Sequence, residues 1–239
     1  MTFQPGGGFQ KQSSESDPLS DLIDAREYDV PYLVRVCTDL DIRSGAWYTV
    51  TPDPHDSHGV TLSDMDAETK ASPTYLAFDI ECTKAPLKFP DADVDSIFMI
   101  SYMVSGQGYL IISRDVVGKD VEDFEYTPKP SYPGPFAIFN ERTEEELIRR
   151  FLSEYQLHRP QIVVTYNGDF FDWPFLEARA ARYGLDLREE LGVERVRPDD
   201  GEYRGRTSVH LDAFHWVQRD SYLPQGSQGL KAVTKYKLG

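Results

Sequence analysis

The order of strand-like and helix-like segments after residue 74 is the feature that most restricts the fold of this chain. Three strand-like apolar segments come first, over residues 75–81, 96–104 and 108–113. Gly106-Gln107 can form the turn between the last two, and short connections of this kind imply antiparallel pairing. Strand and helix patterns then alternate toward the end of the chain. We therefore predict an α/β fold in which helices flank a mixed β-sheet.

The later elements are predicted from hydrophobic period and from signals at their ends. Thr143 and Glu146 stand at the spacing of a capping box, and apolar residues follow them at helical period. A buried strand over 161–166 precedes a helix over 173–183, which Gly184 is expected to end. The other predicted elements are a strand over 209–211, a helix over 212–219, helical residues over 228–238 and a proline-rich loop over 122–136.

Composition divides the chain into three parts. Residues 1–20 are polar and rich in Gly, Gln and Ser, which predicts a disordered leader. This leader has no apolar run, so neither a signal peptide nor a membrane span is expected. Residues 21–73 are predicted to form a small strand-containing unit followed by a linker, and residues 74–239 the main domain.

Two strands are expected in the small unit. Residues Leu33–Cys37 are rich in β-branched side chains, and a second stretch over 42–50 is expected to pair with them. Residues 52–73 are polar, acidic and punctuated by proline, so we expect a linker or a long loop there.

Charge and cysteine content restrict the kinds of site. The formal net charge is −15, which argues against a surface that binds nucleic acid through bulk positive charge. It does not exclude a nuclease, because bound divalent cations change the local field. The two cysteines, Cys37 and Cys82, are far apart and have no Cys/His partners at metal-binding spacing. We therefore expect neither a zinc site nor an iron–sulfur site nor a disulfide framework.

Two carboxylates end the first strand of the main domain. Asp79 and Glu81 are separated by one residue, so on a strand they point to the same face, opposite Phe78 and Ile80. Adjacent carboxylates repel each other, and a bound cation relieves that repulsion. Magnesium prefers such oxygen ligands. The alternative is a solvated strand end that happens to carry two charges.

A second acidic segment follows the strand over 161–166. Asn167-Gly168 turns the chain, and Asp172 stands where the N-cap of the next helix is expected, with Pro174 in the first turn. A plain turn and a plain cap are the alternative to a functional site. A carboxylate at a helix start, beside the end of a strand, is nevertheless well placed to bind a ligand.

The two segments together resemble the first two motifs of the DEDD exonucleases, which have a ribonuclease-H-like fold. Asp79-x-Glu81 corresponds to the first motif, and Asn167 and Asp172 open and close the second. More locally, long runs of the sequence are similar to the exonuclease domain of the epsilon branch of family B DNA polymerases. The similarity extends over about residues 19–239, and its clearest runs are 26–32, 47–48, 76–81, 86–92, 99–103, 106–110, 164–175, 177–181 and 219–224.

The resemblance implies a catalytic site. Asp79, Glu81 and Asp172 are the implied catalytic residues and the implied ligands of two divalent metal ions, Mg²⁺ or Mn²⁺. Asn167, Phe170 and Phe171 are the candidates that line the path of the primer end. Core packing is the other role for these two phenylalanines and for Phe175, and it is the one that residue type favours.

The resemblance also implies parts that this sequence does not show. A third motif would supply a fourth carboxylate and a tyrosine, and we find no such stretch up to Gly239. Asp212 is the only late acidic candidate, and we interpret it as structural. The residues of polymerase catalysis are absent too, and residues 21–73 match only the end of an N-terminal domain. We therefore expect a fragment with weak or no nuclease activity by itself.

The implied partners are the single-stranded 3′ end of a DNA primer and, in the parent protein, accessory polymerase subunits in the nucleus. No membrane is implied. Two alternatives to a proofreading exonuclease region stay open. One is a non-catalytic module that binds single-stranded DNA or a replisome partner, and the other is an RNA exonuclease of the same superfamily.

Overall fold

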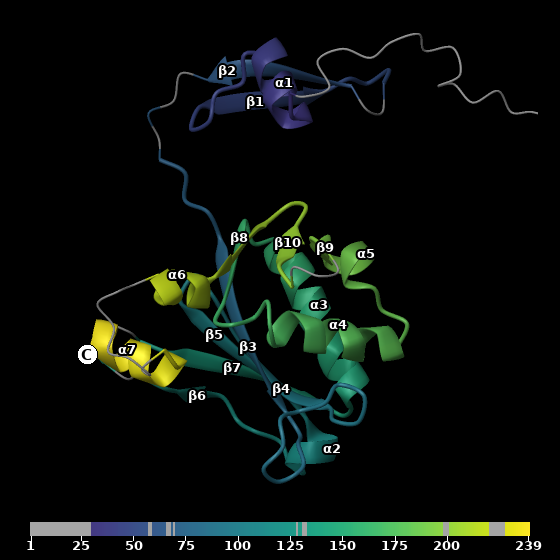
Figure 1. Ribbon diagram of the computed structural model, residues 1–239, viewed down its shortest axis with the longest axis vertical. Coiled ribbons are helices and arrows are strands. Elements are labelled where there is room, and N and C mark those ends of the chain that lie inside the picture. The colour runs from purple at the N-terminus through teal and green to yellow at the C-terminus, as the bar shows by residue number, and fades with distance from the viewer. Residues whose placement is uncertain are drawn as a thin grey trace, which may run out of the picture. The chain divides into compact units, whose positions relative to one another are not determined.

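The computed structural model describes residues 30–56, 59–65, 68, 70–127, 129–130, 133–197, 201–219 and 228–239. Contacts between Cα atoms divide the chain into two compact units, Met1–Lys70 and Ala71–Gly239 (Figure 1). The predicted disordered leader lies outside the described residues.

The first unit begins with a helix where a strand was predicted. Residues Tyr32–Asp39 form α1, so the prediction of a strand over Leu33–Cys37 is wrong. Pairs of residues four apart stabilise the helix: Arg35 binds Asp39 at 2.7 Å, and Thr38 Oγ1 donates to the carbonyl of Val34. These local contacts outweigh the strand preference of β-branched side chains, which is weak and depends on context.

A hairpin follows, whose first strand falls in the stretch predicted to be a strand and whose second strand falls in the segment predicted to be a linker. Strand β1 (Trp47–Pro52) pairs antiparallel with β2 (Val60–Met65), so the predicted pairing of residues 42–50 with Leu33–Cys37 is wrong. The polar residues between the strands form the turn, where Asp53 accepts a hydrogen bond from the backbone of His55. The turn chemistry is therefore present in the sequence, but an acidic, proline-punctuated composition is equally compatible with a linker.

The second unit is built on a seven-stranded mixed sheet, which confirms the predicted fold class. The strand order is β11-β8-β3-β4-β5-β7-β6. Pairing of β3 with β4 and of β4 with β5 is antiparallel, as predicted, whereas β8 pairs in parallel with both β3 and β11. The bounds are β3 (Tyr75–Cys82), β4 (Ile97–Val104), β5 (Gln107–Ser113), β6 (Phe124–Glu125), β7 (Pro135–Glu141), β8 (Ile162–Thr165) and β11 (Val209–Asp212).

Helices cover both faces of this sheet. Figure 1 shows α3 (Glu144–His158), α4 (Asp172–Arg182) and α5 (Leu187–Leu191) on one side, and α6 (Ala213–Arg219) and α7 (Leu230–Leu238) on the other. The short α2 (Arg114–Val117) follows β5. Among the described residues, no helix combines the length and the apolar character that a membrane crossing needs.

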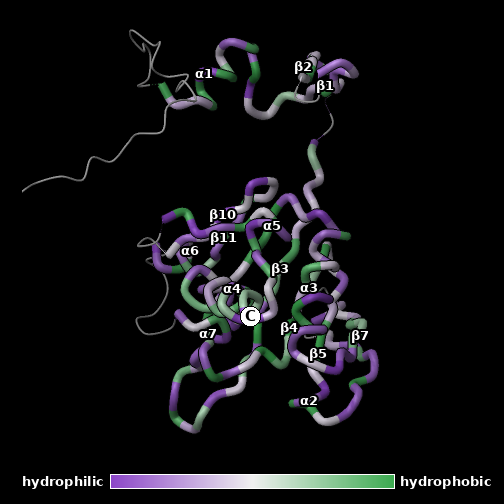
Figure 2. The backbone as a smooth tube through the Cα atoms, turned by 90° about the vertical axis from the view of Figure 1, so that its right-hand side faces the viewer, coloured by the Kyte–Doolittle hydropathy of each residue, from purple (hydrophilic) through white to green (hydrophobic). Residues whose placement is uncertain are grey.

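The predicted capping box at the start of α3 is confirmed. Glu146 N–H donates to Thr143 Oγ1, and the Glu146 carboxylate accepts from Thr143 N–H, both at 3.3 Å. Hydrophobic and hydrophilic residues alternate along this helix (Figure 2). The apolar ones pack against the sheet, where the Phe151 ring lies 5.1 Å from that of Phe78 on β3 and 5.9 Å from that of Tyr102 on β4.

Several elements of this unit were not predicted. The proline-rich segment over 122–136 was predicted to be a loop, but it contains β6 and the first residues of β7. Proline is tolerated there because Pro135 is the first residue of its strand. The short elements α5, β9 (Val193–Arg195) and β10 (Tyr203–Gly205) span three to five residues each, too few for a periodic signal.

Two of the leucines of α3, Leu152 and Leu157, test where the core lies. Leu152 is 3% exposed and Leu157 is 72% exposed, on the same helix. Leu152→Ala should lower the free energy of unfolding by about 2–5 kcal/mol, since it leaves a cavity, whereas Leu157→Ala should change it by less than about 0.5 kcal/mol. Urea denaturation of both variants measures this. Equal losses would contradict the placement of α3 against the sheet.

Candidate active site

Strand β3 carries two carboxylates on its less buried face, the one that α6 and α7 partly cover. Asp79 and Glu81 are exposed, whereas Phe78 and Ile80, on the opposite face, are 5% and 3% exposed. The alternation is the one predicted for a strand. Because β3 lies between β4 and β8 in the sheet, this pair is held at the centre of the unit rather than at a free edge.

A tight turn after β8 carries the second acidic segment. Asn167 has a left-handed backbone (φ 65°), which Asn tolerates better than most residues, and its carbonyl accepts from the N–H groups of Phe170 and Phe171. At Gly168 a Cβ atom would lie 2.3 Å from Thr165 Oγ1. Glycine is therefore required because the turn passes close to the Thr165 side chain at the end of β8.

We predicted Asp172 to be the N-cap of α4, but it is the first residue of the helix, and Phe171 is the N-cap. Its side chain, 1% exposed, turns toward β3, where Oδ1 accepts from Ile80 N–H at 3.0 Å. The ladder between β3 and β8 ends at Ala77, so β8 offers no partner to Ile80. The carboxylate of Asp172 takes that place.

This hydrogen bond brings the two acidic segments together. Burial and then the negative charge of Asp79 raise the pKa of Asp172 to about 7, although the Ile80 N–H opposes the shift. Burial and then the charge of Glu81 raise the pKa of Asp79 as well. The three carboxylates therefore interact as a series, and their mutual repulsion is what a bound cation would remove. An all-oxygen donor set suits Mg²⁺ or Mn²⁺.

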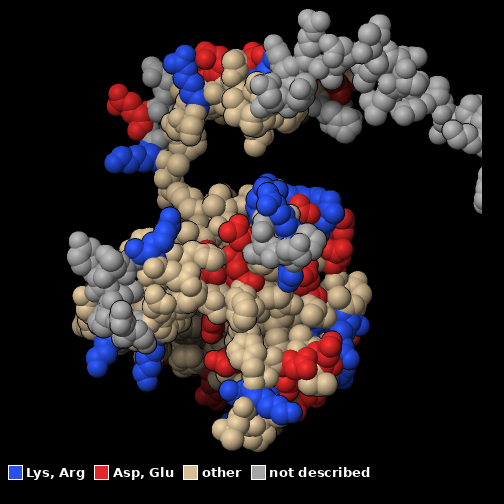
Figure 3. All heavy atoms as spheres, viewed as in Figure 1, with Lys and Arg blue, Asp and Glu red and all other residues tan. Residues whose placement is uncertain are grey.

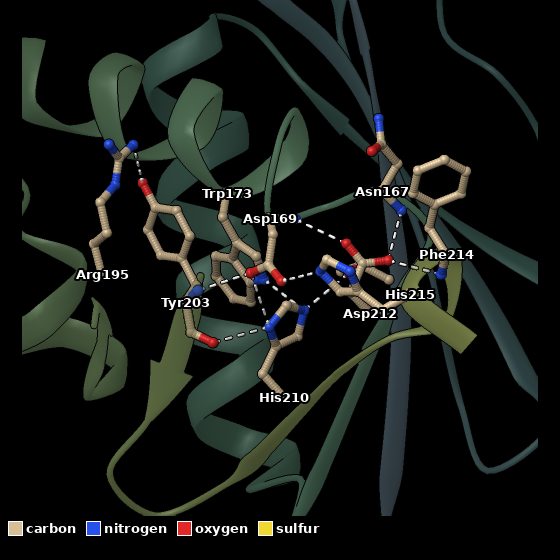
Figure 4. A network of polar contacts seen from close by, with 10 residues as sticks. Asn167, Asp169, Trp173, Arg195, Tyr203, His210, Asp212, Phe214 and His215 are labelled. Atoms are coloured by element: carbon tan, nitrogen blue, oxygen red, sulfur yellow. Dashed lines mark hydrogen bonds and ion pairs between the residues drawn. The ribbon is translucent and has the colours of Figure 1, made fainter. Parts of the chain in front are cut away.

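A different trio lies closer together. Within the described part of the chain, the group whose ligand atoms all fall within 4.8 Å of one another consists of Asp169, Asp212 and His215. Figure 4 shows that hydrogen bonds account for this proximity, since His215 Nε2 contacts Asp169 and Asp212 accepts backbone N–H groups of the turn. The structural role predicted for Asp212 agrees with these contacts.

The predicted substrate-binding residues differ in environment. Phe170 is 73% exposed, so core packing is excluded for it. Phe171 is half-buried, with its ring 5.3 Å from Phe89 and 5.7 Å from Phe175. Phe175 is 5% exposed and belongs to the core, as predicted. Asn167 shapes the turn through its backbone, whose N–H donates to Asp212.

A hollow of about 370 Å³ lies beside Asp79, between the sheet and residues of α6 and α7. Apolar side chains line most of it, including Ala77, Met103, Val164 and Leu230. Figure 3 shows acidic and basic side chains interspersed on the visible face of this unit rather than a field of one sign. The space next to the carboxylates is thus bordered by apolar walls, which strengthen electrostatic interactions.

Sequence reasoning missed the residues around the turn. His210, Tyr203 and Asp169 form a buried network with Trp173, and none of the three was predicted as a site residue. Their spacing in the sequence carries no recognisable motif. The one signal was the alternation of His210 and Asp212, which places both on the same face of a strand.

Comparison with known proteins bears on this arrangement. A model of the family described as "DNA polymerase family B, exonuclease domain" matches residues 23–233. The chain is 54% identical over 229 residues to a DNA polymerase epsilon catalytic chain of Schizosaccharomyces pombe, covering 95% of this chain and 10% of that protein. It is also 54% identical over 230 residues to one of Arabidopsis thaliana, covering 96% and 11%. The chain thus spans about a tenth of the length of the curated relatives it matches.

A solved structure shows the same fold. It is that of the family B DNA polymerase from the hyperthermophilic archaeon Pyrobaculum calidifontis, with a TM-score of 0.59 and 21% identity over 90% of this chain and 26% of that chain. The predicted resemblance and the predicted fold class are both confirmed by these comparisons.

The raised pKa of Asp172 predicts a pH dependence of stability in the absence of divalent ions. The folded pKa, about 7, lies above the ordinary value of 3.8. The contribution to stability is therefore complete below about pH 4 and is lost as pH rises through 7, a change on the order of 4 kcal/mol.

Denaturation in EDTA at pH 4.5 and pH 8 measures this loss, and Asp172→Asn should largely remove it. Asp186→Asn, at an exposed cap of α5 that still accepts its hydrogen bond, should keep it. A steep pH dependence that persists in Asp172→Asn would place its origin elsewhere.

Proposed function

The chain belongs to the exonuclease domain of family B DNA polymerases, and from that premise we propose that it is the 3′→5′ proofreading region of an epsilon-type replicative polymerase. The observation that carries the proposal is the hydrogen bond from Ile80 N–H to Asp172, which joins two acidic segments across the fold. Three repelling carboxylates, of which Asp79 borders a hollow, are an arrangement suited to cations and to a phosphodiester.

The parent protein is part of the same proposal. Because the chain spans about a tenth of its relatives, polymerisation of deoxynucleotides, association with accessory subunits and a nuclear location are proposed for the whole protein. These follow from relatives named as catalytic subunits of DNA polymerase epsilon, an enzyme of DNA replication.

Asp79, Glu81 and Asp172 are the residues proposed to hold two divalent ions, Mg²⁺ or Mn²⁺. Ions bound in this way activate a water molecule and stabilise the leaving 3′-oxygen of the terminal phosphodiester. The charge of Glu81 acts on Asp79 and that of Asp79 acts on Asp172, so all three carboxylates would contribute to holding the ions. Asp172 keeps its orientation through Ile80 N–H while its second oxygen remains available as a ligand.

Phe170, Phe171 and Asn167 are proposed to receive the frayed primer end. The exposed ring of Phe170 and the partly exposed ring of Phe171 offer surfaces on which bases stack without sequence preference. Both lie within two residues of Asp172, so a base stacked there would bring its phosphate near the carboxylates. This arrangement suits single-stranded DNA and not a paired duplex end.

We expect this chain by itself to cleave slowly. Residues 1–239 supply three of the four carboxylates that the family resemblance implies, and Asp212 is engaged by backbone N–H groups. A site with one ligand fewer holds its ions less firmly. The alternative function is a module that binds single-stranded DNA or a replisome partner without cleaving it.

Incubation with Mg²⁺ and end-labelled single-stranded DNA tests the proposal. We expect slow shortening from the 3′ end that EDTA stops. Asp79→Ala should reduce the rate by roughly 100-fold or more, since loss of a metal ligand removes several kcal/mol of stabilisation from the transition state. Asp120→Ala, at an exposed position, is the control and should cleave normally.

The rival functions give different results in the same assay. Cleavage that Asp79→Ala leaves unchanged would refute the assigned site. Salt-dependent DNA binding without cleavage, retained after loss of both Asp79 and Glu81, would favour the binding module. Faster trimming of RNA than of DNA ends would favour an RNA exonuclease.

A further inference from the structure

The end of β11 holds the turn that leads to Asp172. Strand β11 runs parallel to β8, with Asp212 opposite Thr165 in register. After Thr165 the chain leaves β8 in a turn, where Asn167 N–H donates to Asp212 Oδ1 at 2.7 Å. Asp169 N–H donates to Oδ2 at 3.1 Å. One carboxylate therefore binds two residues of the turn, as Figure 4 shows.

A carboxylate is specifically suited to this place. Asp212 is 7% exposed, and its Oδ1 also accepts from Phe214 N–H at 2.9 Å, so three backbone donors converge on two oxygens. Ionised carboxylates accept hydrogen bonds at both oxygens and form the stronger, charge-assisted kind. An amide at this position would direct its own N–H₂ group against a backbone N–H. Asparagine is therefore similar in shape but unable to make the same contacts.

His210 lies on the same face of β11 as Asp212 and contacts Trp173, the residue that follows Asp172. The indole N–H of Trp173 donates to His210 Nε2 at 3.1 Å, so Nε2 is an acceptor. Nδ1 then carries the proton and donates to the carbonyl of Tyr203 at 3.0 Å. The ring is thus fixed in orientation by partners at both of its nitrogens. The residue after Asp172 is anchored in this way, as the residues before it are anchored by Asp212.

The close trio that includes Asp212 does not need an ion of its own. Both Asp212 oxygens already accept N–H groups, and Asp169 Oδ2 contacts His215 Nε2 at 3.2 Å. Asp169 Oδ1 accepts from Tyr203 N–H at 2.7 Å. These contacts connect the turn to β10, β11 and α6.

We propose that Asp212 is a positioning residue for the metal ligand Asp172, acting through the turn and not by touching the ions. The inference rests on the proposed function, because it assigns Asp172 to the metal site. The carboxylate of Asp172 accepts from Ile80 N–H, and the turn fixes the position of the backbone from which the Asp172 side chain extends. When the two N–H groups of the turn lose their acceptor, the turn loosens and Asp172 spends less time in the geometry that binds an ion.

Binding of Mn²⁺ to the 239-residue chain, followed by electron paramagnetic resonance of the free ion, tests the inference. Asp212→Asn should raise the Mn²⁺ dissociation constant about 10- to 100-fold, the range typical when a group that orients a ligand is lost. Amide hydrogen exchange at Asn167 and Asp169 should accelerate in the same variant. The weak cleavage rate should recover at saturating Mn²⁺, since the ligand is displaced and not removed.

Asp186→Ala is the matched control. It removes a carboxylate that caps α5 by accepting from Arg188 N–H at 2.8 Å, so it costs stability without touching the turn. If Asp212→Asn weakens Mn²⁺ binding no more than this control, the positioning role is wrong. Asp79→Asn separates that outcome from failure of the proposed function. Unchanged Mn²⁺ binding in Asp79→Asn would overturn the metal site, and the inference with it.

Discussion

The hydrogen bond between Asp172 and the backbone of Ile80 is the contact on which the rest of the site depends. It exists because β8 is shorter than β3, which leaves an N–H in the middle of the sheet without a strand partner. A buried N–H requires an acceptor. Here the acceptor is a charged side chain that also faces Asp79, so satisfying the backbone and concentrating negative charge are accomplished by one residue.

Asp172 is the first residue of α4, and a buried ion pair fixes the other end of that helix. Arg179, near the end of α4, donates through Nε to Glu144 Oε1 at 2.9 Å, and the same oxygen accepts from Ile97 N–H at 2.7 Å. Tyr183 also donates to Glu144. Both charges are less than 10% exposed, and a pair of this kind is costly to break because it leaves one charge buried and unpaired. Helix α4 is therefore tied to α3 and β4 at one end and to β3 at the other.

Much of this arrangement could be predicted from the sequence, and the exceptions have physical causes. The alternation of Asp79 and Glu81 with Phe78 and Ile80 fixes their faces because a strand has period two. The capping box at Thr143 is a local signal, and it was confirmed. By contrast, α1 and the pairing of β1 with β2 were missed, because β-branched residues and polar turns are compatible with more than one local structure. Only the N-cap position of Asp172 was predicted wrongly, because a helix-start carboxylate looks the same in sequence whether it caps its own helix or reaches a strand 92 residues away.

The parallel register of β8 between β3 and β11 has a consequence for the order in which the molecule is assembled. Antiparallel β3, β4 and β5 are neighbours along the chain and can pair as soon as they leave the ribosome. The edge that orients Asp172 needs β11, which ends at Asp212, so it closes over a long loop and does so late. During synthesis, the central strands of the sheet can therefore pair before β11 is present, and the contacts around the turn that leads to Asp172 form only after residue 212 has emerged.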